Sequence, residues 1–364
     1  MRKITLLSRH STRLCLASIC MFHSQVFAAG ITEAWTLRIS DLPGSRIMKA
    51  ATVFDIAFSP NGQRLAVIAG AGRPGESTYL VILNTANPAS EPQIIADDGP
   101  VGYGHMLSWS SPTRIAIPEV FQKLGQPGCI LERQIHLEFY DANRLAEVKK
   151  AIIGRTIQSY DASCEPVSAF DVPGHWSLSD GSCDHRLLAL TTTVAHQLQI
   201  ALVDPAARKI TRQWQLGDAW SSWPRFADSG NAICATDGVG KSGVAHCWEV
   251  DSGREIAKTT SGNMQDPLQT ALYAKRAILS DYGWKFDFER WEIEAGSLRR
   301  RVLWDFGTGE ELASWSPKRQ LDTLGAKQPY TFALSPDGKM VAEGGSGEVT
   351  LSKVESRQDS VKRH

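Results

Sequence analysis

Two passages at opposite ends of the chain are near copies of each other, and this internal repeat constrains the fold more than any other feature. Residues Phe54–Gly70 read FDIAFSPNGQRLAVIAG, and Tyr330–Gly345 read YTFALSPDGKMVAEGG. Each alternates apolar and polar residues, turns at Ser-Pro-Asn/Asp-Gly and continues into a second apolar stretch. Proline fixes φ near −65° and glycine accepts positive φ, so both suit a tight turn between antiparallel strands. The passages predict two hairpins of one repeated unit.

Weaker copies of the hairpin fill the interval. Their first strands and turns lie at 106–112, 176–181, 224–230 and 271–276, the last with its glycine turn lost. A third apolar strand then ends each unit at a polar stop, and a fourth strand usually follows. The stops recur 47 to 63 residues apart, at Asn84, Asp141, Asp204, Asp251, Asp305 and Glu355. Six units of about four strands each are typical of a β-propeller.

These motifs resemble the WD40 superfamily and its bacterial WD40-like relatives over nearly all of residues 35–356. The Ser-Pro-Asn/Asp-Gly hairpins are the most specific match, and Trp304-Asp305 is the nearest copy of the family's terminal dipeptide. Gly104-His105 and Gly174-His175 are similar to the family's Gly-His pair. The resemblance implies that His105 and His175 donate hydrogen bonds where the chain enters a blade. No aspartate is assigned to the family's buried hydrogen-bond tetrad.

The expected fold is a single all-β domain at residues 29–356, a propeller of six four-stranded blades. An isolated strand at 34–40 precedes the first unit, and the last unit supplies only three strands. We therefore expect the N-terminal strand to complete the last blade and close the ring. A seventh blade would require a degenerate unit within residues 142–175. The polar residues 357–364 are expected to form a disordered tail.

Residues 1–28 have the order of regions found in a secretory signal peptide. Four basic residues precede a nine-residue apolar stretch at 14–22, and small residues surround the bond after Ala28. That stretch is too short to span a bilayer, and no later one approaches eighteen residues, so no membrane insertion is expected. The predicted location is periplasmic or secreted. The alternative is the irregular start of a cytoplasmic protein.

The charge balance argues against nucleic acid as a partner. The chain has 39 basic and 39 acidic residues, and removal of the four leader cations leaves 35 minus 39, a net charge of −4. No basic excess remains to neutralise phosphates.

A disulfide is predicted between Cys234 and Cys247. The glycine-rich residues 236–243 should connect neighbouring antiparallel strands. A register whose paired residue numbers sum to 481 places the two cysteines directly opposite, within reach of a disulfide. The alternative is two reduced core cysteines. Three others stay unassigned: Cys129, Cys164 and Cys183.

Catalytic motifs are scarce. The sequence has no nucleophile elbow, zinc-protease motif, phosphate-binding loop or dinucleotide fingerprint, so no catalytic residue, metal or cofactor is predicted. Glu292 and Glu294 alternate onto one strand face, which indicates a solvated surface more than a catalytic pair.

Propeller geometry predicts where a binding site would lie. Connections that enter each inner strand, and those that join the second and third strands, emerge on one face of the disc. We call it the loop face. Its predicted binding residues are Tyr103, His105, His175, Trp176, Trp220, Trp223, Tyr282 and Trp284.

The predicted function is an exported, monomeric, non-enzymatic scaffold that binds a protein or peptide on this loop face. A propeller enzyme of the lactonase or quinoprotein type, acting in the central channel, is one alternative. A carbohydrate or cell-wall binder using the same aromatic face is another.

Overall fold

The computed structural model describes residues 30–42, 52–70, 78–88, 90, 92–97, 107–124, 130–143, 146–156, 159–160, 166–167, 177–182, 186–194, 197–204, 207, 209–216, 224–236, 244–259, 264–282, 285–287, 292–294, 298–316, 331–345 and 347–355. These residues form 28 strands and two short 3-10 helices, Ile39–Asp41 and Asp228–Gly230.

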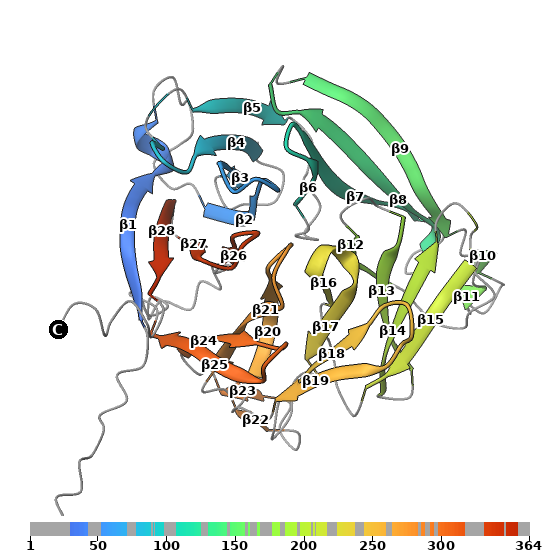
Figure 1. Cartoon of the computed structure of the whole chain (residues 1–364). Coiled ribbons are helices and arrows are strands. Elements are labelled where there is room, and N and C mark those ends of the chain that lie inside the picture. The colour runs from blue at the N-terminus through green and yellow to red at the C-terminus, as the bar shows by residue number, and fades with distance from the viewer. Residues whose placement is uncertain are drawn as a thin grey trace, which may run out of the picture.

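Six four-stranded antiparallel sheets surround a common axis like the blades of a propeller (Figure 1). We number the blades along the chain and give their strands from the axis outward. Blades 1 and 2 are formed by β2 (Thr52–Phe58), β3 (Arg64–Gly70), β4 (Thr78–Asn84) and β5 (Gln93–Asp97), and by β6 (Ser108–Ser111), β7 (Arg114–Leu124), β8 (Ile130–Asp141) and β9 (Ala146–Thr156). Blades 3 and 4 are formed by β12 (Ser177–Gly181), β13 (Leu188–Val194), β14 (Gln197–Asp204) and β15 (Lys209–Gln215), and by β16 (Arg225–Ala227), β17 (Ala232–Thr236), β18 (Ala245–Glu249) and β19 (Glu255–Thr259). Blades 5 and 6 are formed by β20 (Met264–Thr270), β21 (Arg276–Tyr282), β24 (Leu298–Asp305) and β25 (Glu310–Trp315), and by β26 (Thr331–Leu334), β27 (Met340–Gly344), β28 (Glu348–Val354) and β1 (Ile31–Arg38).

The predicted all-β propeller of six four-stranded blades is confirmed. The segment where a seventh blade would have lain contains the outer strand β9 of blade 2. It also contains a two-residue strand pair, β10 (Ser159–Tyr160) and β11 (Pro166–Val167). Among the residues that the structure describes, residues 142–175 form no further four-stranded sheet.

Blade 6 is built from both ends of the chain. β1 pairs antiparallel with β28, from Ile31 opposite Val354 to Arg38 opposite Glu348. The outer strand predicted at 34–40 therefore exists, but it begins at Ile31, and residues 39–41 turn into a 3-10 helix. Trp35 adds a contact with blade 1, because its Nε1–H donates to the carbonyl oxygen of Thr85 at 2.8 Å.

Each of the two predicted Ser-Pro hairpins is held by its serine. The Ser59 Oγ accepts the backbone N–H of Arg64 at 2.9 Å, and the Ser335 Oγ accepts that of Met340 at 2.8 Å. The glycines of both turns, Gly62 and Gly338, have φ of 70°, where a side chain would be strained. The repeated sequence thus encodes a repeated set of turn contacts.

The polar stops of the third strands have a structural role in the turn that follows. The side chains of Asp141, Asp204 and Asp305 each accept a backbone N–H two or three residues later, at 2.8 to 2.9 Å. Asn84 does the same with the N–H of Ala86 at 2.8 Å. Short Asx turns of this kind explain why the stop is Asp or Asn in five of the six units.

The inner strand of blade 5 differs from the prediction. Residues 271–276 were expected to supply that strand, but β20 ends at Thr270 and residues 271–275 form the turn to β21. The pairing of β20 with β21 is irregular between Gln265 and Gln269, around Pro267, which cannot donate a ladder hydrogen bond. This irregularity interrupts the alternation of apolar and polar residues by which the other inner strands were predicted.

The hydrophobic core lies between neighbouring blades. One cluster joins blades 6 and 1 through residues such as Leu351 and Val67, and another joins blades 5 and 6 through Leu303 and Phe332. Similar clusters join blades 1 and 2, 3 and 4, and 4 and 5. Adjacent blades therefore stabilise each other by burying apolar side chains in a shared layer.

Candidate functional site

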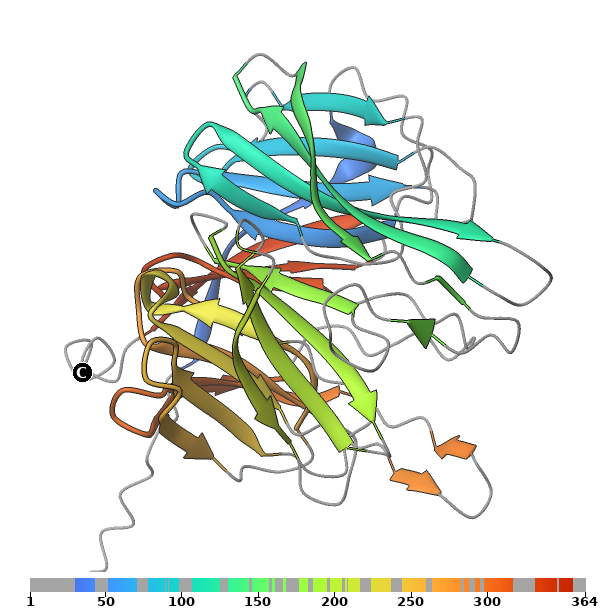
Figure 2. The same ribbon diagram turned by 90° about the vertical axis from the view of Figure 1, so that its right-hand side faces the viewer.

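The two faces of the ring are built differently. The loop face receives long connections, such as residues 98–107, 157–176 and 316–330, which lead into inner strands. The opposite face, which we call the turn face, carries the short connections from first to second and from third to fourth strands, such as 59–63 and 306–309. Figure 2 shows the long strands of blade 2 and the added pair β22 (Lys285–Asp287) and β23 (Glu292–Glu294) extending toward the same side.

Most residues predicted for the loop face lie outside the described residues: Tyr103, His105, His175, Trp176, Trp220, Trp223 and Trp284. Tyr282 is the last residue of β21, where its backbone pairs with that of Leu298 at the loop-face end of blade 5. Glu292 and Glu294 lie in β23, two residues apart as expected. The aromatic cluster on this face stays a prediction.

A cavity of about 130 Å³ lies in the central channel toward the turn face. All six blades contribute to it, and it reaches Pro60, Leu272 and Pro336 in three of the turns. Its apolar wall includes Phe58, Trp109, Phe226 and Leu334, and its polar wall includes Ser108, Ser182, Gln269 and Thr270. Two charged side chains also line it, Asp55 and Arg225.

Asp55 connects the inner strands of blades 1 and 2. One carboxylate oxygen accepts the N–H of Ile56 at 2.8 Å, and the other accepts the N–H of Leu107 at 2.7 Å. The residue is 4% exposed, so these two N–H groups replace hydration that the carboxylate has lost. Trp109 strengthens the same junction by donating its Nε1–H to the carbonyl oxygen of Ala57 at 3.1 Å.

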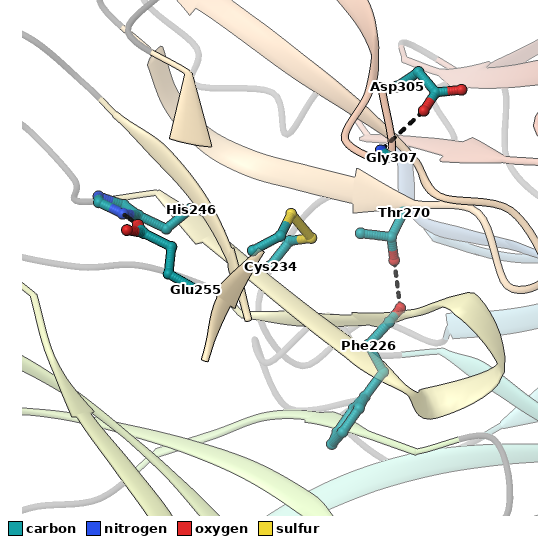
Figure 3. Close-up of a disulfide and its surroundings, with 8 residues drawn as sticks. Phe226, Cys234, His246, Glu255, Thr270, Asp305 and Gly307 are labelled. Atoms are coloured by element: carbon teal, nitrogen blue, oxygen red, sulfur yellow. Dashed lines mark hydrogen bonds and ion pairs between the residues drawn. A yellow bond between two sulfur atoms is a disulfide. The ribbon is translucent and has the colours of Figure 1, made fainter. Parts of the chain in front are cut away.

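Arg225 begins the inner strand of blade 4 and is 8% exposed. Its neighbour Phe226 is held to blade 5, because the Thr270 hydroxyl donates to the Phe226 carbonyl oxygen at 2.5 Å (Figure 3). Neither Arg225 nor Asp55 was predicted as a site residue from the sequence. The available signal was one charged residue within an otherwise apolar inner strand, as in Phe54-Asp55-Ile56.

Cys234 and Cys247 form a disulfide between β17 and β18, with both residues fully buried (Figure 3). They lie directly opposite in the register that was predicted, with Cα atoms 4.1 Å apart. Beside them, His246 stacks on Trp248 with ring centroids 5.4 Å apart, and its Nδ1 lies 2.5 Å from a carboxylate oxygen of Glu255. These groups join the middle and outer strands of blade 4.

Basic side chains at the start of second strands lie opposite the acidic stops. Arg114 is paired with Asp141 and Arg276 with Asp305 in the strand register, and the second pair has its charged groups 3.9 Å apart. Opposite charges in register stabilise neighbouring strands modestly. In blades 2 and 5 they place a cation on the second strand and a carboxylate on the third strand, both at the turn face.

Within the described part of the chain, no three His, Cys, Asp or Glu side chains gather as metal ligands would. The same residues include no helix long and apolar enough to cross a bilayer.

No protein-family model matches the chain, and neither does any curated protein. Solved structures do match its fold. One is a chain of a mitotic checkpoint complex, with a TM-score of 0.52 and 12% identity over 98% of this chain and 99% of that chain. Another is the β-propeller domain of Cps50 (Swd1) from Myceliophteria thermophila, with a TM-score of 0.51 and 12% identity over 89% of this chain and 99% of that domain. The chain therefore has the fold of a six-bladed β-propeller.

Proposed function

We propose that this protein is an exported, non-enzymatic scaffold that binds a protein or peptide partner on its loop face. The observation that carries the proposal is the asymmetry of the ring. The additions to the four-stranded blades, β22–β23 and the 11- and 12-residue strands β7 and β8, extend on the loop-face side (Figure 2).

The connections between strands also differ in length between the two faces. Connections on the turn face are four or five residues in most blades, whereas those leading into inner strands range from four residues at 260–263 to fifteen at 316–330 and twenty at 157–176. Long loops placed on a rigid scaffold are where binding residues concentrate, because they can vary without disturbing the core. Tyr103, Trp176, Trp220 and Trp223 fall in connections that lead into inner strands, Trp284 falls in the connection between the second and third strands of blade 5, and Tyr282 ends β21.

The similar solved structures support a partner-binding role by analogy of fold. One of them was solved within a mitotic checkpoint complex, so a propeller of this shape takes part in a protein assembly there. The export part of the proposal is supported by the leader pattern at residues 1–28 and by the buried disulfide, since stable disulfides form mainly in oxidising compartments.

The test is a pull-down from the envelope fraction with the mature protein and two variants. The double variant Trp220→Ala/Trp223→Ala removes two predicted aromatic contacts from the loop face. The matched control is Tyr273→Ala on the turn face, where Tyr273 is 54% exposed. We expect the double variant to lose the captured partner at unchanged melting temperature, and the control to retain it.

Capture that is lost in Tyr273→Ala and kept in the double variant would move the partner to the turn face. A large fall in the melting temperature of the double variant would show instead that Trp220 and Trp223 pack between blades. Either result contradicts the assignment of these two rings to a binding surface.

A further inference from the structure

The cavity at the turn-face end of the channel has features of a small-molecule site that the loop-face proposal does not use. We propose that it binds a small organic anion, a monocarboxylate with an apolar body of about one ring, through the guanidinium of Arg225. This inference concerns a different surface and a different class of ligand from the partner proposed above.

The size of the cavity limits the ligand. Its volume is about 130 Å³. An engineered protein cavity of about 150 Å³ accommodates benzene, so a ligand of roughly that size fits and a peptide segment does not. The aromatic residues Phe58, Trp109 and Phe226 are among those that line it, which suits an apolar body.

The charges of the lining select the sign of the ligand. Asp55 already accepts a backbone N–H on each carboxylate oxygen, and these donors stabilise its ionised form within the protein. Arg225 is the one cationic side chain among the described residues that line the cavity. A guanidinium has five N–H donors in a planar fork, so it can bind a neighbour and a carboxylate together.

The surroundings of the mouth favour an anion as well. The described first-to-second-strand turns and the residues that follow them carry six basic side chains against the two acidic ones of Asp228 and Asp337. The basic ones are Arg64, Arg114, Arg186, Lys275, Arg276 and Lys339. Lys275 has Asp228 at 4.0 Å, and Arg114 and Arg276 lie opposite Asp141 and Asp305 in the strand register. Six cations against these four carboxylates leave an excess of two, which favours an anion at the mouth.

The test uses sodium benzoate as the probe, with benzamide as its neutral isostere and benzylammonium as its cationic counterpart. Binding is measured by calorimetry and by ¹⁹F NMR of protein carrying 5-fluorotryptophan. The resonance of Trp109 is assigned with the Trp109→Phe variant. We expect benzoate to bind with a Kd of about 1 mM or tighter, to shift the Trp109 resonance, and to bind at least about tenfold better than benzamide.

Three variants locate the site. Arg225→Gln should weaken benzoate about 10- to 100-fold, as expected for loss of a charge-assisted hydrogen bond. Ser108→Leu keeps the cation but fills the cavity, so it should abolish binding even if Arg225→Gln fails to fold. Lys339→Gln removes an exposed cation that does not line the cavity and should change the Kd less than about threefold.

Equal affinity for benzoate and benzamide would overturn the role of Arg225. Preferred binding of benzylammonium would assign the site to Asp55 and a cation instead. Unchanged benzoate binding in Ser108→Leu, or no saturable binding at all, would overturn the cavity as the site. None of these results affects the proposed loop-face partner, which the pull-down tests separately.

Discussion

Arg301 and Glu343 form a buried ion pair that joins blades 5 and 6. Arg301, on β24, is fully buried, and its Nη1 donates to a carboxylate oxygen of Glu343 on β27. The guanidinium also lies 3.9 Å above the centre of the Phe332 ring, on the inner strand of blade 6. A buried pair of this kind adds little net stability over apolar packing, but breaking it removes a carboxylate that faces a buried guanidinium.

We therefore expect Glu343→Gln to lower the free energy of unfolding by about 3 kcal/mol, because the Arg301 charge would then be buried beside a neutral amide. Urea denaturation of the mature protein measures the change. The matched control is Arg38→Gln, which breaks the Arg38–Glu348 pair, where the arginine side chain is 64% exposed. That change should cost less than about 1 kcal/mol. Equal losses in the two variants would contradict the inter-blade role of the buried pair.

The Cys234–Cys247 disulfide gives a prediction that chemistry can check directly. In exported protein, unfolded without reductant, neither thiol should react with an alkylating reagent, and both should react after reduction. Peptide mapping distinguishes the two states. The bond closes a loop with a sequence separation of 13, so reduction should lower stability by about 3 kcal/mol at most in the chain-entropy model. Alkylation of both cysteines before reduction would refute the bond.

At the scale of elements, β1 is the strand whose removal should change the molecule most. It covers the outer edge of β28, and Trp35 ties it to blade 1. Deletion of residues 30–38 should lower the urea midpoint and promote association, because β28 would become an exposed edge. A synthetic peptide of residues 29–42 should restore monomer and stability. The control Trp35→Phe removes only one hydrogen bond and should cost about 1 kcal/mol.

A truncated protein that stays monomeric with an unchanged urea midpoint would show that β1 does not hold the ring together. The pairing of β1 with β28 would then contribute nothing measurable to the stability of the fold.

The elements that sequence reasoning predicted are those encoded by local contacts. The hydrogen bonds of the serine turns and of the Asx turns each join residues that are close in sequence, at Ser59, Ser335, Asp141 and Asp305. The same short motif therefore recurs in the sequence wherever the same turn recurs in the structure. The pair β10–β11 was not predicted, because strands of two residues carry too little alternation to be recognised. The alternation of Glu292 and Glu294 indicated a strand at β23, but its three-residue partner β22 was not predicted.

The channel cavity could not be predicted for a different reason. Its lining comes from all six blades, only one to four consecutive residues from each, so no window of sequence contains it. Arg225 and Asp55 lie 170 residues apart in the chain and line the same cavity only because the blades are arranged around one axis. The blade assignments were sufficient to place both residues on inner strands, but not to show that they line one space.

For the whole molecule, the leading prediction is export. N-terminal sequencing of the protein from the periplasm or the medium should return Ala29, because residues 1–28 carry the basic, apolar and small-residue regions that a signal peptidase recognises. Fractionation of the producing cell provides the control, with a cytosolic marker protein. Recovery of Met1 from the cytosolic fraction would contradict the prediction.

The pairing of β1 with β28 also determines where the two ends of the described chain lie on the propeller. The backbone N–H of Glu355 donates to the carbonyl oxygen of Gly30 at 3.0 Å, so both ends of the described chain leave from one point on the outer rim of blade 6. A tether attached at either end would therefore hold the disc at its outer rim. Both flat sides would stay open to solvent, so a partner on one side and a small molecule on the other need not compete for space.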